Sequence, residues 1–186
     1  MMAKVYIFLA DGYEEIEGLT VVDLLRRANI DTIMVSVTGN LAVTGSHQIT
    51  TITDVLYESA DFKDADMLVL PGGMPGTINL MEHKGLDLLL KEFHAKGKLL
   101  AAICAAPRVL GTKGLLIGKN ATCYPGNEEF LNCARVINTS VVTDGNITTS
   151  KGMGTAIDFA LSLIKSISGK EEAVKIAKAI QYPHYH

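Results

Sequence analysis

Short apolar segments alternate with helical segments along this chain, and this alternation constrains its fold more than any other feature. Residues typical of buried strands form the segments Lys4–Ala10, Asp31–Thr38, Asp66–Leu70 and Lys98–Ile103. Helical signals mark the segments Glu14–Ala28, Leu86–Lys96, Ala105–Gly111, Gly152–Ser168 and Gly169–Ile180. Strands that alternate with helices form βαβ units in a parallel sheet. We therefore predict an α/β fold, a flavodoxin-like sandwich with a mostly parallel sheet and helices on both of its faces.

Turn residues between short strands predict two additional antiparallel hairpins. These hairpins pair Leu41–Val43 with Gln48–Thr53, and Val141–Thr143 with Ile147–Ser150. His47 lies in the first turn, where we expect a surface role. The chain has 186 residues, with no linker and no internal repeat, so we predict a single domain over residues 1–186.

Composition and charge exclude several classes of partner. The net charge is −3 and Lys and Arg form no block or stripe, so we expect no nucleic-acid binding. Apolar runs such as Leu99–Ala106 are too short to span a bilayer. Met1–Ala10 has no cleavage site of small residues, so we interpret it as a strand of a cytoplasmic protein. The three cysteines should then be free thiols, and their spacing predicts no metal site.

Three unusual loops follow predicted strands: Asp11–Glu17, Pro71–Gly76 and Cys104–Pro107. The carboxyl ends of parallel strands meet at one edge of a sheet, and functional sites of open α/β sheets form at that edge. If the three strands are parallel neighbours, the loops converge there. The sequence thus predicts a site built from these loops.

Cys104 is the most chemically reactive residue expected at that site. It ends an apolar strand and opens a predicted helix, where the helix dipole can lower a thiol pKa to about 3.5–7.5. We therefore expect a reactive, low-pKa thiol on a sharp turn, and a buried structural cysteine is the alternative. Backbone N–H groups of Gly72 and Gly73 could form an oxyanion site beside it, or the two glycines could simply make a tight turn.

An acidic partner for the thiol could come from the first loop. Glu14 and Glu17 can both point inward, and helical periodicity does not choose between them. Burial raises the pKa of a carboxyl, so such a group would stay protonated and could act as a general acid or base.

Four motifs occur in order along the chain: Asp11-Gly12-Tyr13-Glu14-Glu15-Ile16-Glu17, Val69-Leu70-Pro71-Gly72-Gly73, Ala101-Ala102-Ile103-Cys104-Ala105-Ala106-Pro107 and Thr149-Ser150-Lys151-Gly152-Met153-Gly154-Thr155. Together they resemble the ThiJ/PfpI family, and within it the branch of the parkinsonism-associated DJ-one proteins and their bacterial YajL-type relatives. The likeness extends from Lys4 to about Ala179. It implies a flavodoxin-like fold and a homodimer.

The resemblance also implies roles for individual residues. Cys104 would be the nucleophile and the oxidation-sensitive thiol, Glu17 its protonated partner, and the N–H groups of Gly73 and Ala105 the oxyanion site. Family proteases place His directly after the cysteine, so Ala105 leaves a peptidase mechanism without its base. Tyr124 stands where some branch members have His, and its hydroxyl titrates near 10, which makes it a poor base.

These features lead to a functional hypothesis: a cysteine-dependent, cofactor-independent enzyme of glyoxalase or deglycase type. Its partners would be a small reactive dicarbonyl or a glycated protein or nucleotide, and we expect no metal. Cys104 and Glu17 would be the catalytic residues, and Gly72, Glu14 and Tyr124 would line the pocket. A redox sensor or redox-regulated chaperone is the alternative, and a cysteine protease or amidase is a third and weaker hypothesis.

Overall fold

A computed structural model describes residues 3–132 and 134–184, and a seven-stranded sheet forms its centre. The strand order is β10-β11-β7-β6-β1-β2-β5. The bounds are β1 Lys4–Leu9, β2 Asp31–Ser36, β5 Val55–Leu56, β6 Met67–Leu70, β7 Leu99–Ile103, β10 Val141–Asp144 and β11 Ile147–Ser150. All neighbours run parallel except β10 and β11, which form an antiparallel hairpin. The predicted α/β, flavodoxin-like architecture is confirmed.

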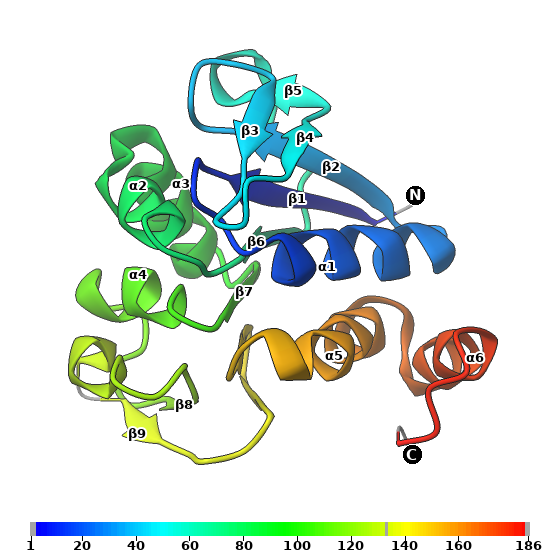
Figure 1. The fold of residues 1–186 in the computed structure, drawn as a ribbon. Coiled ribbons are helices and arrows are strands. Elements are labelled where there is room, and N and C mark those ends of the chain that lie inside the picture. The colour runs from blue at the N-terminus through cyan, green and yellow to red at the C-terminus, as the bar shows by residue number, and fades with distance from the viewer. Residues whose placement is uncertain (1–2, 133, 185–186) are drawn as a thin grey trace.

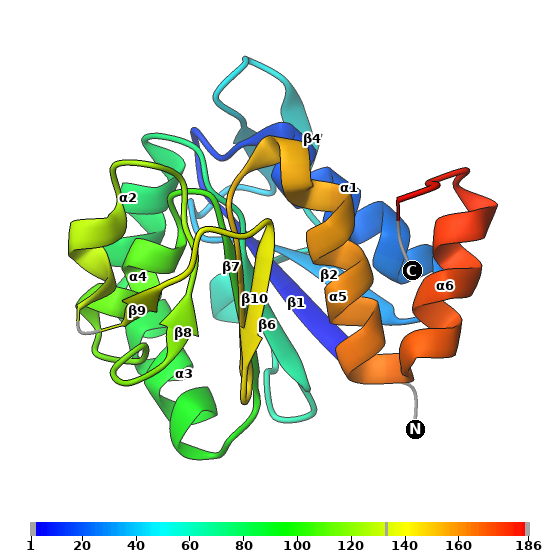
Figure 2. The same ribbon diagram turned by 90° about the horizontal axis from the view of Figure 1, so that it is seen from below.

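Helices cover both faces of the sheet (Figures 1 and 2). One face carries α1 (Glu15–Arg27) and α5 (Ala156–Ser168), and α6 (Lys170–Ala179) packs against α5. The other face carries α2 (Gly76–Glu82), α3 (Lys84–Ala95) and α4 (Pro107–Thr112). Each layer encloses its own apolar core, because alternate residues of a buried strand point to opposite faces.

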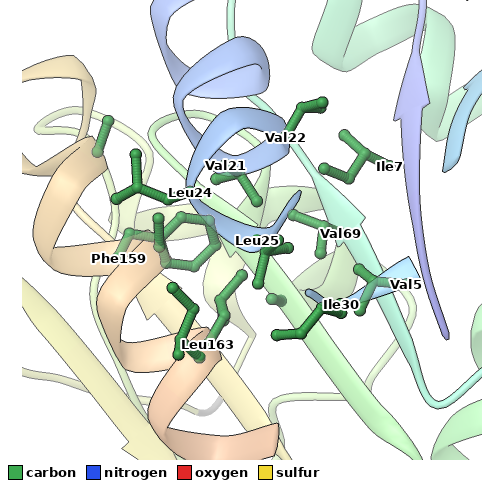
Figure 3. Close-up of a cluster of buried hydrophobic side chains, with 14 of the residues drawn as sticks. Val5, Ile7, Val21, Val22, Leu24, Leu25, Ile30, Val69, Phe159 and Leu163 are labelled. Carbon is green, nitrogen blue, oxygen red and sulfur yellow. The ribbon is translucent and has the colours of Figure 1, made fainter. Parts of the chain in front are cut away.

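Strand β1 shows how the two cores are separated. Val5 and Ile7 lie in the core beneath α1 and α5, whereas Tyr6 and Phe8 lie in the core beneath α2, α3 and α4. Figure 3 shows the first core, where Phe159 from α5 lies beside side chains of α1. Burial of this kind contributes roughly 25 cal/mol per Å² of apolar surface removed from water. Packing in the two cores fixes the position of α1 against the sheet and the position of β7 within it.

Several elements differ from the expectations. Helix α2 was not predicted, and the helix expected from Ala105 begins only at Pro107. The first hairpin, β3 (Ala42–Thr44) and β4 (Thr50–Ile52), forms a separate two-stranded sheet, whereas the second joins the central sheet through β11. Short elements that sequence periodicity does not signal are β8 (Asn120–Ala121), β9 (Arg135–Val136) and the 3-10 turns Tyr57–Ser59, Glu128–Leu131 and Met153–Thr155.

The carboxyl ends of β1, β6 and β7 lie side by side, since these strands are parallel neighbours. Their three loops therefore meet at one edge, as the sequence predicts. Cys104 and Cys123 are free thiols, and Cys133 lies outside the described residues. Across residues 3–132 and 134–184, no helix combines the length and the apolar character needed to cross a membrane.

Candidate functional site

Cys104 lies on a sharp turn between β7 and α4. Its backbone has a φ of +66°, in the left-handed region that a non-glycine residue occupies at a cost of about 1–3 kcal/mol. Two long-range hydrogen bonds hold the turn: the Cys104 N–H donates to the Ser150 carbonyl at 2.9 Å, and the Tyr124 N–H donates to the Cys104 carbonyl at 2.8 Å. The predicted strand–turn–helix placement is confirmed, and the neighbouring strand β11 keeps it in place.

Glu17 reaches the same place from the first turn of α1. Its side chain is only 1% exposed. One carboxyl oxygen, Oε2, accepts the Gly72 N–H at 2.9 Å. The other, Oε1, is buried without a well-aligned hydrogen bond from any described residue. A Cβ placed on Gly152 would lie 3.9 Å from both Oε1 and the Cys104 sulfur, so the free carboxyl oxygen and the thiol share one small space.

Two adjacent glycines in the loop after β6 make this close approach feasible. A Cβ on Gly72 would lie 2.6 Å from the Cys104 Cβ and 2.7 Å from Glu17 Oε2, closer than packed atoms allow. Gly73 has a φ of +90°, which favours glycine. The N–H groups of Ala105 and Gly73 lower the pKa of the thiol. The backbone thus presents two donors to an anion at this position.

Burial dominates the electrostatics of the pair. It raises the pKa of Glu17 to about 7, against the opposing effects of the Cys104 and Gly72 hydrogen bonds. Burial and the adjacent Glu17 charge raise the pKa of Cys104 to about 12. The prediction of a low pKa for the Cys104 thiol is therefore wrong for a site in which Glu17 is ionised. The helix dipole gives little help, because α4 has six residues and begins three residues after Cys104.

The pair can nevertheless generate a nucleophile. Between a pH of about 7 and a pH of about 12, the thiol and the carboxyl hold one proton between them. A buried carboxylate beside a thiol can take the thiol proton as the sulfur attacks, which is general-base activation. The carboxyl can then return that proton to a bound intermediate.

The remaining pocket candidates divide into two groups. Tyr124 lies beside the pair, with its ring 3.2 Å from a Cβ placed on Gly152 and its side chain half-exposed. Glu14 does not join it: its carboxylate approaches Ser46 and His47, both at 3.3 Å. The structure thus makes the choice that periodicity left open, because residue 14 precedes the first turn of α1. Sequence reasoning gave Gly152 no place in the site, although this glycine lies in the fourth family motif.

Comparison with known proteins places this geometry in a family. Residues 3–166 match the model of the DJ-1/PfpI family. The chain belongs to the DJ-1/PfpI family. The resemblance drawn from the four motifs is therefore confirmed, and the catalytic roles that it implies for individual residues stay predictions.

Several relatives cover the chain almost completely. Protein DJ-1 homolog B of Arabidopsis thaliana is 39% identical over 176 residues, which span 94% of this chain and 40% of that protein. The chain thus spans less than half of the plant relative. Protein dj-1beta of Drosophila melanogaster is 37% identical over 182 residues, 97% of each chain. A "deglycase" of Pyrococcus abyssi is 32% identical over 154 residues, 81% of this chain and 91% of that protein.

Solved structures of the family superpose closely. Toxoplasma gondii DJ-1, described as oxidized, matches with a TM-score of 0.94 at 37% identity, covering 98% of this chain and 100% of that one. The Drosophila DJ-1beta structure matches with a TM-score of 0.95 at 35% identity, covering 99% and 100%.

Proposed function

We propose that this DJ-1/PfpI protein is a cysteine-dependent enzyme that converts small 1,2-dicarbonyls, or their adducts, to 2-hydroxy acids without a cofactor. One observation carries the proposal: the buried, incompletely hydrogen-bonded carboxyl of Glu17 lies beside the Cys104 thiol, on a backbone that offers two N–H groups. That arrangement supplies a nucleophile, a proton carrier and an oxyanion site. The relative named a deglycase supports the same substrate class.

The first step of the proposed reaction is addition of the thiol to the aldehyde carbon. A sulfur–carbon bond forms, the carbonyl becomes an oxyanion, and the thiol proton passes to Glu17. The N–H groups of Gly73 and Ala105 hold the oxyanion. Glu17 then gives its proton to this oxygen, which yields a neutral hemithioacetal and restores the carboxylate.

The second step is an internal transfer of hydrogen between the two carbons. Glu17 removes the C1 hydrogen as a proton, and the electron pair moves onto the C2 carbonyl to give an enediolate. Glu17 returns the proton to C2 while the C1 carbonyl re-forms, and the C1 hydroxyl proton ends on the C2 oxygen. C1 is oxidised and C2 is reduced, so no external oxidant is needed. Water then hydrolyses the thioester to a 2-hydroxy acid and free Cys104.

Loss of methylglyoxal tests the proposal directly. Cys104→Ser and Cys104→Ala should lose essentially all turnover, while Cys123→Ser, a change at another buried thiol, should retain it. The product should be lactate, identified by chromatography. Full activity in Cys104→Ala would contradict the proposal.

A second function, redox sensing by the same thiol, is favoured by a separate observation: a structural relative from Toxoplasma gondii is described as oxidized. Two peroxide molecules would add two oxygen atoms to Cys104 and leave two water molecules, giving a sulfinate. The protonated form of Glu17 could donate a hydrogen bond to it. Intact-mass analysis after mild peroxide treatment should place the added oxygens on Cys104, and their placement elsewhere would contradict sensing. We propose no peptidase, since Ala105 follows the thiol.

A further inference from the structure

The β3–β4 turn lies near the start of α1 (Figure 1). Four side-chain atoms converge between these two segments. They are Glu14 Oε2, Glu15 Oε2, Ser46 Oγ and His47 Nδ1. His47 Nδ1 lies 3.0 Å from Glu15 Oε2 and 3.3 Å from Glu14 Oε2. Ser46 Oγ lies 3.3 Å from each carboxylate oxygen and 3.1 Å from the imidazole nitrogen. Five of the six separations therefore fall between 3.0 and 3.3 Å, and the two carboxylate oxygens lie within 4.8 Å of each other.

Two carboxylates share few hydrogen atoms in this cluster. The Ser46 hydroxyl supplies one hydrogen and the imidazole Nδ1 supplies at most one. Within the described residues, His47 is the only basic side chain in ion-pair range of Glu14 and Glu15, so even a protonated imidazole leaves one negative charge uncompensated. A divalent cation at the centre would bind all four atoms and neutralise that charge.

The site is built into the fold. Glu15 is 4% exposed, and its second oxygen accepts the His47 N–H at 2.7 Å, which fixes the carboxylate. The turn approaches so closely that a Cβ on Gly45 would overlap the Glu15 carboxylate. Glycine at this position thus lets the hairpin backbone close over the acid. The donor atoms come from two elements that the fold already holds together.

We infer that Glu14, Glu15 and His47, with Ser46 Oγ at the fourth vertex, form a zinc site that fastens the β3–β4 hairpin to α1. Tetrahedral zinc with oxygen and nitrogen ligands at about 2.0–2.2 Å has ligands about 3.3–3.6 Å apart, a few tenths of an ångström from the observed spacing. An imidazole nitrogen suits zinc better than Mg²⁺ or Ca²⁺, and Ca²⁺ needs about six to eight oxygens. The inference does not depend on the proposed dicarbonyl chemistry.

Calorimetric titration of the full chain tests the inference, with ZnCl2 as the probe after treatment with a chelator. The wild type should bind one Zn²⁺ per chain, and His47→Ala should weaken binding about tenfold or more, since even outer-shell changes cost about 10–100-fold. The His47 side chain is two-thirds exposed, so this variant should fold. Glu14→Gln provides a second variant with the same expected loss.

Two matched variants locate the bound metal. His184→Ala, in the exposed C-terminal segment, and Cys104→Ala should both bind zinc as the wild type does. Zinc should also raise the thermal midpoint of the wild type but not that of His47→Ala. The inference is overturned if the wild type binds no zinc, if His47→Ala and Glu14→Gln both bind it with wild-type affinity, or if Cys104→Ala abolishes binding.

Discussion

Glu15 and Glu17 are two residues apart on α1 and almost equally buried, yet their environments act on them in opposite directions. Their exposed fractions are 4% and 1%. Burial alone would raise both pKa values. At Glu15, hydrogen bonds from the His47 side chain and from the backbone N–H groups of His47 and Ile49 outweigh burial and lower the pKa. At Glu17, burial prevails and raises the pKa to about 7.

The comparison shows that the donors around a buried carboxylate decide the direction in which its pKa shifts. Glu15 is surrounded by donors on the hairpin and is held as an anion, which suits a structural or metal-binding group. Glu17 has one backbone donor at Oε2 and a thiol beside Oε1, which suits a group that exchanges a proton. The predictions below test this division.

The largest expected effect is on turnover. Glu17→Gln should lower kcat for methylglyoxal about a hundredfold to ten-thousandfold, because the amide keeps the shape but cannot take up a proton. Circular dichroism should show an unchanged fold. Glu58→Gln, at an exposed glutamate, serves as the control and should retain wild-type turnover. A Glu17→Gln enzyme with wild-type kcat would remove Glu17 from the proposed chemistry.

Moving Glu17 relative to the thiol should have the next largest effect. Gly72→Ala inserts a methyl group 2.6 Å from the Cys104 Cβ and 2.7 Å from Glu17 Oε2. We expect a loss of about 1–3 kcal/mol in the free energy of unfolding and a fall in turnover, measured by urea unfolding and by methylglyoxal assay. Gly154→Ala is the matched change, since a Cβ there meets nothing within 4 Å. Equal behaviour of the two variants would disprove the close packing.

The Glu15→Gln substitution should lower the stability of the folded protein. The change removes a buried anion from donors that are arranged for it, so the free energy of unfolding should fall by about 1–3 kcal/mol. Urea unfolding at pH 8 with a chelator measures the loss without any contribution from bound metal. A stability equal to that of the wild type would show that the donors around Glu15 do not select its charged form.

The smallest expected effect is the pH dependence of Glu17→Gln stability. In the folded state the pKa of Glu17 is raised from 4.5 to about 7, so ionisation destabilises the fold increasingly as the pH rises through that interval. Glu17→Gln should therefore gain a few degrees in thermal midpoint at pH 8 in metal-free buffer, and no gain should remain at pH 4. A gain of equal size at both pH values would point to packing rather than charge.

Much of the fold could be predicted because each strand and helix carries its own periodic signal. The segment Lys4–Ala10 became β1 within one residue, and Glu14–Ala28 became α1 within one residue at each end. Helix α2 was missed because it begins at Gly76, the last residue of the loop Pro71–Gly76, and the loop residues conceal its start. Helix α4 begins at Pro107 because Cys104 takes a left-handed backbone conformation that a helix cannot include.

The sequence by itself determined the order of strands and helices, the three loops at one sheet edge and, through the family motifs, the pair Cys104 and Glu17. Only the tertiary structure decided the protonation chemistry. Periodicity tells which side of an element a residue occupies, whereas a pKa depends on burial and on donors a few ångströms away. Those donors, Gly72 for Glu17 and His47 for Glu15, are more than thirty residues distant along the chain. The pKa values of two glutamates in one helical turn therefore shift in opposite directions, for reasons that only the fold supplies.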